Sequence, residues 1–218
     1  MPTAPVRPDR SDKLAATRVR GAIIAGGQAA RLGGRAKGLE TVGGERIIDR
    51  LVGECERAFG AAPLLVANAP DAATWRPGLR VVRDVLPGLG ALGGIYTAVL
   101  EAPAPVVCLA WDMPFVTAEL LSVLAAGLTD REAFLPESEG PQGLEPLCAA
   151  YGPGCAEAIR ASIDAGDLRA AGFHSRIRAG LLPLGEVRRV GDPARLFFNV
   201  NTADELARAE ALWHASSR

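Results

Sequence analysis

Histidine is scarce in this 218-residue sequence, and its scarcity excludes several kinds of active site. Only His174 and His214 are present. Two histidines are too few for a histidine cluster that holds a metal ion, and they leave few candidates for a Ser-His-Asp triad. We expect both histidines to be ordinary surface or partly packed residues.

Cysteine is also sparse, and the cysteines show no C-x-x-C spacing. A structural zinc site and a disulfide framework are therefore not expected, and a reducing cytoplasm fits this usage better. The four cysteines are Cys55, Cys108, Cys148 and Cys155.

Long hydrophobic runs and an excess of charge are missing as well. No apolar run approaches the ~18 residues of a membrane span, and the N-terminus has no apolar segment typical of a secretory signal. The net charge of −1 argues against a nucleic-acid or membrane partner. Hydrophobic residues make up 49% of the chain, enough for a sizeable core. We expect a loose tail over residues 1–17 and one domain over residues 18–218.

Short apolar runs alternate with segments of helical period along the chain. This alternation predicts one three-layer α/β domain with a mostly parallel sheet covered by helices on both faces. Ligands of such sheets bind beyond the carboxyl ends of the strands. We expect strands at 19–25, 63–67, 79–83, 105–110, 132–135, 146–150 and 186–190, and helices at 46–59, 92–101, 117–127, 155–165 and 202–214.

A loop rich in glycine and basic residues, residues 26–34, follows the first expected strand. Its paired glycines allow backbone amides to turn towards a ligand. Arg31, Arg35 and Lys37 add positive charge, and Lys37 is the only lysine outside the expected tail, which holds Lys13. The segment therefore predicts a polyphosphate site, although it is not a Walker A loop. The alternative is a surface turn that is rich in Gly and Arg by chance.

A second glycine motif suggests a different ligand. "GLGALG", residues 88–93, matches the dinucleotide fingerprint, with Asp112 as an acidic candidate further on. However, the fingerprint should follow directly on a strand, whereas "DVLP" intervenes here. A dinucleotide site would also leave the first loop unexplained, so it remains the weaker alternative.

Polar residues stand where several expected strands end. Asp84 and Asp112 each follow a strand, where a carboxylate could hold a hard cation against phosphate oxygens. Both are also common loop-start residues. Asn199 and Asn201 in "FFNVNT" would share one face of a strand and could bind a ligand or a metal-bound water. A plain turn before the next helix is the alternative for them.

Five segments together resemble a known family. "IIAGGQAARLGGRAKGL", "RDVLPGLGALGGI", "WDMPF", "EPLCAAY" and "FFNVNT" occur in the order seen in molybdenum cofactor guanylyltransferases, which are nucleotidyltransferases with a Rossmann-like fold. The resemblance runs from about residue 19 to residue 211. It implies transfer of GMP from GTP to molybdopterin-bound molybdenum cofactor, with Mg²⁺ present and pyrophosphate released.

The resemblance also assigns roles to individual residues. Lys37 and Asp112 are similar to the catalytic pair, and Asp112 to the Mg²⁺ ligand. Asn199 and Asn201 are candidates to line the site. The residues expected to bind the nucleotide are Ile24, Ala25, Gly26, Gly27, Arg31, Lys37, Asn68, Asp84 and Asp112.

Two positions depart from the family pattern. The family commonly has an acid before the lysine, where this chain has Ala36, so Lys37 is expected to be less tightly oriented. Trp111 replaces a cysteine before the aspartate and is expected to narrow the pocket. Two alternatives remain open: a sister nucleotidyltransferase with another base or acceptor, such as a cytidylyltransferase or a sugar-phosphate enzyme, and a non-catalytic nucleotide- or cofactor-binding protein. Cofactor-delivery proteins and molybdoenzymes are possible transient partners.

Overall fold

The computed structural model describes residues 19–26, 31–32, 35–102 and 104–215, so the expected tail lies outside it. The strands are β1 (Arg20–Ile24), β2 (Arg31–Leu32), β3 (Arg35–Ala36), β4 (Thr41–Val42), β5 (Glu45–Arg46), β6 (Leu64–Val66), β7 (Arg80–Val82), β8 (Val106–Ala110), β9 (Ala133–Pro136), β10 (Cys148–Tyr151) and β11 (Ala179–Leu182). The helices are η1 (Lys37–Leu39), α2 (Ile47–Phe59), α3 (Ala72–Trp75), α4 (Gly90–Glu101), α5 (Ala118–Ala126), α6 (Cys155–Asp164), η2 (His174–Arg176), α7 (Leu184–Val190), α8 (Pro193–Leu196) and α9 (Ala203–Ala215).

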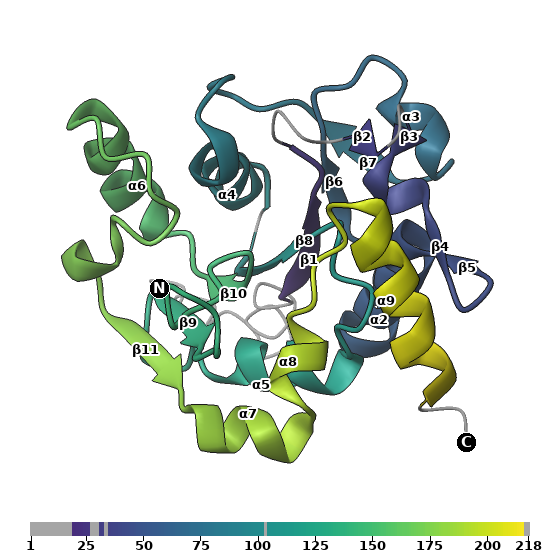
Figure 1. Cartoon of the computed structure of the whole chain (residues 1–218). Helices are drawn as coiled ribbons and strands as arrows, with labels where there is room; N and C mark the ends of the chain where they lie inside the picture. Colours follow the sequence, from purple (N-terminus) through teal and green to yellow (C-terminus); the bar gives the residue numbers. More distant parts are fainter. Residues whose placement is uncertain (1–18, 27–30, 33–34, 103, 216–218) are drawn as a thin grey trace, which may run out of the picture.

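Seven strands form one sheet at the centre of the molecule, in the order β11-β9-β10-β8-β1-β6-β7 (Figure 1). All of them run parallel except β10, which is antiparallel to both of its neighbours. The prediction of a mostly parallel sheet is confirmed. Because β7, β6, β1 and β8 are parallel neighbours, their carboxyl ends meet at one edge, which we call the carboxyl edge.

Helices cover both faces of the sheet, as the alternating apolar pattern predicts. In β1, Ile23 packs in the core beneath α2 and α5, whereas Ala22 and Ile24 pack in the core beneath α4 and α6. Figure 1 shows α4 and α6 on one side of the sheet and α2 on the other. The three-layer architecture follows from the period-2 alternation of buried strands.

The expected strand at residues 186–190 is wrong, because this segment belongs to helix α7. Val187 is fully buried while Arg188 and Arg189 are exposed, which fits one turn of an amphipathic helix rather than an alternating strand. Glu186 in the first turn and the two arginines in the last turn also complement the helix dipole. The edge strand is β11 instead, a short "AGLL" segment that carries little strand signal.

Within the described parts of the chain, no helix is both long and apolar enough to cross a bilayer.

Helix α4 packs closely against the carboxyl end of β1. A Cβ added at Gly94 of α4 would lie 2.5 Å from Cγ2 of Ile24, the last residue of β1. At Gly53 in α2, the nearest atom to an added Cβ is 3.6 Å away, an ordinary contact. The two helix glycines therefore differ in packing and not in backbone conformation.

We predict opposite effects on stability for alanine at these two positions. Gly94→Ala lowers the free energy of unfolding, because overpacking costs about 1–3 kcal/mol, more than the about 0.5–1 kcal/mol that alanine gains over glycine in a helix. Gly53→Ala raises it by about 0.5–1 kcal/mol. Urea denaturation of both variants measures the difference, and equal effects would contradict the packing argument.

Candidate active site

A buried lysine lies at the carboxyl edge. Lys37 is only 4% exposed, and its Nζ donates a 2.5 Å hydrogen bond to Oδ1 of Asn201. The same Nζ lies 3.8 Å from Oδ2 of Asp112. Three polar side chains that are distant in sequence therefore meet at one point, and a buried ammonium is stable only with such partners.

Short backbone pairings deliver Lys37 to this point. Arg31 pairs with Ala36 in the β2–β3 hairpin, and Lys37 opens η1 directly afterwards. Ala36 is buried in the apolar core beneath α2 and α5. Ala36 therefore anchors the chain by packing, while the side chain of Lys37 is oriented by Asn201 and Asp112.

Asp112 follows β8, which lies beside β1 in the sheet. The amide of Trp111 donates to the carbonyl of Ile24 at 3.2 Å, so Asp112 stands next to the beginning of the glycine-rich loop. Burial raises the pKa of Asp112 above its ordinary value, and nearby Lys37 offsets part of this effect. Glu205 adds to the rise in the pKa through like-charge repulsion.

The expectation that Trp111 narrows the pocket is wrong. Trp111 is 2% exposed and belongs to the core beneath α2 and α5. Its ring stacks on that of Trp75 with centroids 5.0 Å apart. The side chain therefore points into the core, and it is not among the residues that line the cavities beside Asp112.

Asn199 and Asn201 lie in the connection between α8 and α9 and not in a strand, so the expected strand setting is wrong. Between them Val200 is fully buried, and its amide donates to the carbonyl of Asp112 at 2.9 Å. Both asparagines line the cavities next to Asp112. Because the side chains on either side of the buried Val200 point away from it, Asn199 and Asn201 face the same side even though they are not in a strand.

A capping box at the start of α9 holds Asn201. Glu205 Oε2 accepts hydrogen bonds from the amides of Asn201 and Thr202, and the amide of Glu205 donates to Oγ1 of Thr202. This reciprocal pairing is the usual way to satisfy the first turn of a helix. It fixes the backbone of Asn201 and thereby positions the side-chain amide oxygen that accepts the hydrogen bond from Lys37.

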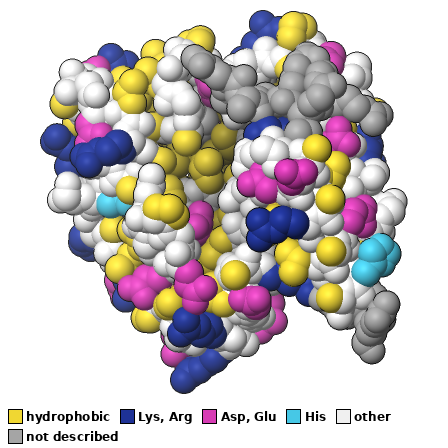
Figure 2. Space-filling view, in the orientation of Figure 1, with side chains coloured by type: hydrophobic (Ala, Val, Ile, Leu, Met, Phe, Trp, Pro, Cys, Tyr) yellow, Lys and Arg dark blue, Asp and Glu magenta, His cyan; other side chains and the backbone are white. Residues whose placement is uncertain are grey.

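Two cavities open beside Asp112. One, of about 470 Å³, is lined by Asp112 and Ala91 at the start of α4, and the other, of about 570 Å³, reaches Glu205. They share Asn199 and Asn201, so together they form one cleft. Figure 2 shows the surface hollowed near the middle of this face, with hydrophobic side chains at the floor and acidic side chains around it.

A second polar group lies further along the carboxyl edge. Asn68 follows β6 and Asp84 follows β7, and the two residues are joined by two hydrogen bonds, one between their side chains and one from a backbone amide. Asn68 Nδ2 donates to Asp84 Oδ2 at 2.6 Å, and the amide of Asp84 donates to Asn68 Oδ1 at 2.9 Å. Asn68 is exposed and Asp84 is half-buried. Since β1 separates β6 from β8, this pair and Asp112 stand on the two sides of the glycine-rich loop.

The described residues of the loop leave the sheet at Gly26. The amide of Ala25 still donates a hydrogen bond to the carbonyl of Val66 at 2.8 Å. Among the described residues, no atom lies within 4 Å of a Cβ added at Gly26, so none of them requires glycine there. Gly27 lies outside the described residues, and the side chain of Arg31 is not described either, so their expected contacts stay predictions.

The second glycine motif does not follow a strand directly, as the dinucleotide fingerprint requires. β7 ends at Val82, and Gly90 begins α4. Gly88 and Gly90 have φ angles of 86° and 59°, which favour glycine, so they serve a turn into the helix.

Sequence reasoning missed three acidic residues of the cleft, Glu139, Glu145 and Glu205. Glu145 lines both cavities, and burial raises the pKa of its carboxyl while a hydrogen bond with Ser138 lowers it. Glu205 lines the second cavity. The T-x-x-E pattern at Thr202 was a readable signal for Glu205 as a capping residue, and Glu145 opens the "EPLCAAY" segment, which was quoted for the resemblance but given no role in the site.

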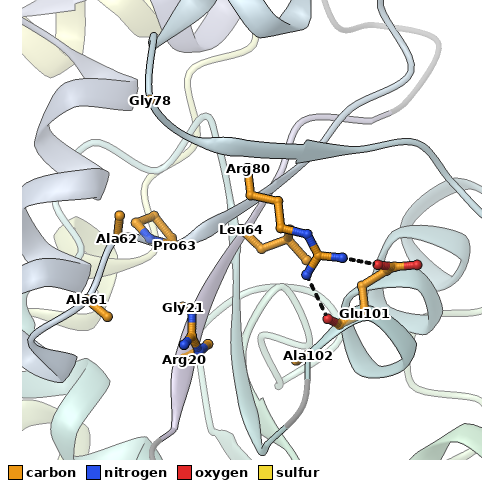
Figure 3. A pocket seen from close by; sticks show the side chains of 10 residues that line it. All are labelled: Arg20, Gly21, Ala61, Ala62, Pro63, Leu64, Gly78, Arg80, Glu101 and Ala102. Atoms are coloured by element: carbon orange, nitrogen blue, oxygen red, sulfur yellow. Dashed lines mark hydrogen bonds and ion pairs between the residues drawn. The ribbon is translucent and has the colours of Figure 1, made fainter.

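A third cavity lies at the opposite edge, where β1, β6 and β7 begin. It measures about 410 Å³, and its lining includes Arg20, Arg80 and Glu101. In Figure 3 the guanidinium of Arg80 points to Glu101, with which it forms an ion pair and a backbone hydrogen bond, and Arg20 lies apart. Arg80 and Glu101 in this cavity pair with each other, and the cavity lies at the end of the strands opposite to Asp112. We therefore assign this cavity no catalytic role.

A three-layer, mostly parallel sheet with a basic glycine-rich loop after β1 and a half-buried acid after β8 is typical of nucleotidyltransferases with a Rossmann-like fold. The model of the MobA-like NTP transferase domain matches residues 21–178. The chain belongs to this family of nucleotidyltransferases.

Individual relatives agree with this class. A probable molybdenum cofactor guanylyltransferase of Pelotomaculum thermopropionicum is 33% identical, over 88% of this chain and 92% of the relative. The molybdenum cofactor guanylyltransferase of Desulfosudis oleivorans is 30% identical, over 88% and 95%. The crystal structure of molybdopterin-guanine dinucleotide biosynthesis protein A from Archaeoglobus fulgidus is 25% identical, with a TM-score of 0.74 over 91% of this chain and 100% of that one.

We predict that the pKa of Asp112 responds in opposite directions to two substitutions. Lys37→Met raises it, because the cation that favours the carboxylate is removed, and Glu205→Gln lowers it, because a repelling charge is removed. A pH titration followed by the ¹³C signal of the Asp112 carboxyl measures both shifts. Glu205→Gln keeps an oxygen for the capping box, and parallel shifts in the two variants would contradict the assigned geometry.

Proposed function

We propose that this protein transfers GMP from GTP to the terminal phosphate of molybdopterin-bound molybdenum cofactor and releases pyrophosphate. Relatives that carry this activity in their names align over most of both chains, which supports the proposal. The observation that carries it is the buried Lys37, which faces Asp112 and Asn201 beside a cleft at the carboxyl edge.

The chemistry asks for charge stabilisation and not for a general base. The attacking phosphate of the acceptor is already ionised at neutral pH, so no histidine is needed to activate it. The obstacle is bringing two anions together and stabilising the charge that builds on the α-phosphate and the leaving group. The Lys37 ammonium, held on one side by Asn201, is placed to neutralise such a phosphate oxygen.

Asp112 suits a magnesium ion. Its carboxylate is a hard oxygen ligand, its side chain is 15% exposed, and its 3.8 Å separation from Lys37 leaves an oxygen available. Within the described residues no three His, Cys, Asp or Glu side chains gather into a metal site. A bound Mg²⁺ would screen the phosphates electrostatically, and it commonly uses one or two carboxylates together with substrate phosphates.

The acidic lining of the cleft favours the same conclusion. Asp112, Glu139, Glu145 and Glu205 line the two cavities. A triphosphate and a second anionic substrate would be repelled by these carboxylates unless cations intervene. Lys37, a divalent ion and the arginines of the glycine-rich loop are the candidates for that task.

The nucleotide would lie along the carboxyl edge, from Asp112 past Gly26 to the Asn68–Asp84 pair. Four neighbouring strands at ~4.8 Å spacing put about 14 Å between the ends of β8 and β7, enough for an extended nucleotide. None of the described residues has an atom within 4 Å of a Cβ added at Gly26, so they leave a phosphate free to approach the backbone there. The cleft that Asn199 and Asn201 line is then left for the acceptor.

We also propose a cytoplasmic location with transient contacts to proteins that deliver or receive the cofactor. All four cysteines are free, buried thiols, as is usual in a reducing compartment.

We predict that Asp112→Ala abolishes turnover and that Lys37→Ala lowers kcat/KM by about 30- to 1,000-fold. The second figure corresponds to the loss of ~2–4 kcal/mol of transition-state stabilisation. Pyrophosphate release with GTP, Mg²⁺ and molybdopterin cofactor measures both, and circular dichroism checks that the variants fold. Asp164→Ala, on the exposed surface of α6, is the matched control and should keep the normal rate. A normal rate in Asp112→Ala would remove this residue from the site.

We predict selective stabilisation by GTP in a thermal-shift panel of GTP, CTP, ATP and NAD with Mg²⁺. A ligand that binds only the folded state raises its stability with the logarithm of concentration over Kd. Selective stabilisation by CTP would favour a cytidylyltransferase over a guanylyltransferase. Selective stabilisation by NAD would contradict nucleotidyl transfer altogether. GTP binding without pyrophosphate release would favour the accessory protein.

A further inference from the structure

Separate anchors hold the two segments that carry Lys37 and Asp112. In η1 the amide of Glu40 donates to the carbonyl of Lys37, so the turn closes on itself. The end of β8 is bound instead to β1 and to the connection before α9, through Trp111 and Val200. The ring of Trp111, next to Asp112 in the chain, packs closely on Gly38, next to Lys37.

This contact is tight. A Cβ added at Gly38 would lie 2.6 Å from Cε3 of Trp111 and 3.1 Å from Cδ2, so no larger residue fits while the ring keeps its place. Gly38 is buried and its φ is not in the left-handed region, so packing and not backbone freedom explains the glycine. On its own side of the core the ring stacks on Trp75. Since protein interiors are close-packed, the ring cannot be compressed or easily displaced.

The ring stands next to a gap that matters for the reaction. A charge-assisted contact pair has an N–O distance of about 2.7–2.9 Å, whereas Lys37 Nζ lies 3.8 Å from Asp112 Oδ2. If the pair closed, the ammonium and the carboxylate would neutralise each other in a site of low dielectric, and both would be lost to the ligands. Kept apart, the ammonium can bind a phosphate while the carboxylate binds a cation.

We propose that Trp111 is a positioning residue, whose indole against Gly38 sets the distance at which Lys37 and Asp112 face each other. The indole touches neither substrate nor the reacting atoms. It acts through Asp112, which follows Trp111 in the chain, and through Lys37, which precedes Gly38. The consequence for catalysis rests on the proposed guanylyl transfer, but the effect on geometry does not.

Crystal structures of variants test the geometry directly. In Trp111→Leu the ring is removed, and we expect the Lys37–Asp112 distance to fall by about 1 Å to that of a contact pair. Trp111→Phe keeps most of the ring and should keep the gap. An unchanged 3.8 Å distance in Trp111→Leu would overturn the proposal and leave Trp111 as ordinary core packing.

Kinetics test the coupling between Trp111 and Gly38. Trp111→Leu and Gly38→Ala should each lower kcat up to about 100-fold, the cost of an error of ~1 Å in position. In the double variant the new methyl group occupies the space that the ring leaves, so the rate should exceed that of either single variant. Independent losses that simply multiply would refute the coupling.

A control separates positioning from loss of stability. Leu124→Ala empties part of the same core at α5, away from the charged pair, and should lower the urea midpoint while kcat stays normal. If Leu124→Ala lowers kcat as much as Trp111→Leu does, the effect of Trp111 is loss of stability and the proposal fails. If the wild-type protein releases no pyrophosphate, the proposed function fails, while the crystallographic distances still decide the role of Trp111.

Discussion

The rest of the site depends on a buried ammonium that is only partly compensated. Lys37 has one neutral amide at hydrogen-bond distance and one carboxylate further off. Such a charge is costly to bury, and its surroundings hold it through hydrogen bonds and packing from several elements. The same incomplete compensation makes the group reactive towards an anion, because a fully paired lysine would have to break its ion pair before it could bind a phosphate. Stability and function thus place opposite demands on this point.

The fold meets these demands by bringing loops from the ends of neighbouring strands to one edge. β1 supplies the glycine-rich loop, β8 the acid and β6 with β7 the Asn68–Asp84 pair, while the connection before α9 adds the side-chain amide that binds Lys37. The core on each face fixes the strands, so the site is built on a rigid frame with its polar groups carried by loops. Division of labour of this kind explains how Trp111 can act on the site from inside the core.

Much of the fold could be predicted because buried parallel strands and amphipathic helices carry strong local patterns. β1, β6 and β8 are apolar runs, and α2 shows its buried stripe at helical spacing. The errors fall where local signals are weak: α7 is a seven-residue helix with one buried side chain, and β11 is a short edge strand. In the site, the scarcity of lysine singled out Lys37, and strand ends singled out Asp112. The contact of Lys37 with Asn201 and the inward turn of Trp111 depend on tertiary packing, which no local pattern records.

The hydrogen bond between Lys37 and Asn201 has a consequence for biosynthesis, because its two residues are 164 positions apart. At ~5–20 residues per second, a ribosome adds Asn201 roughly 10–30 s after Lys37. During that interval the glycine-rich loop and the first strands have already emerged, but the lysine has no amide to receive it. Lys37 therefore acquires its hydrogen-bond partner only late in synthesis, once the connection between α8 and α9 has left the ribosome and folded against it.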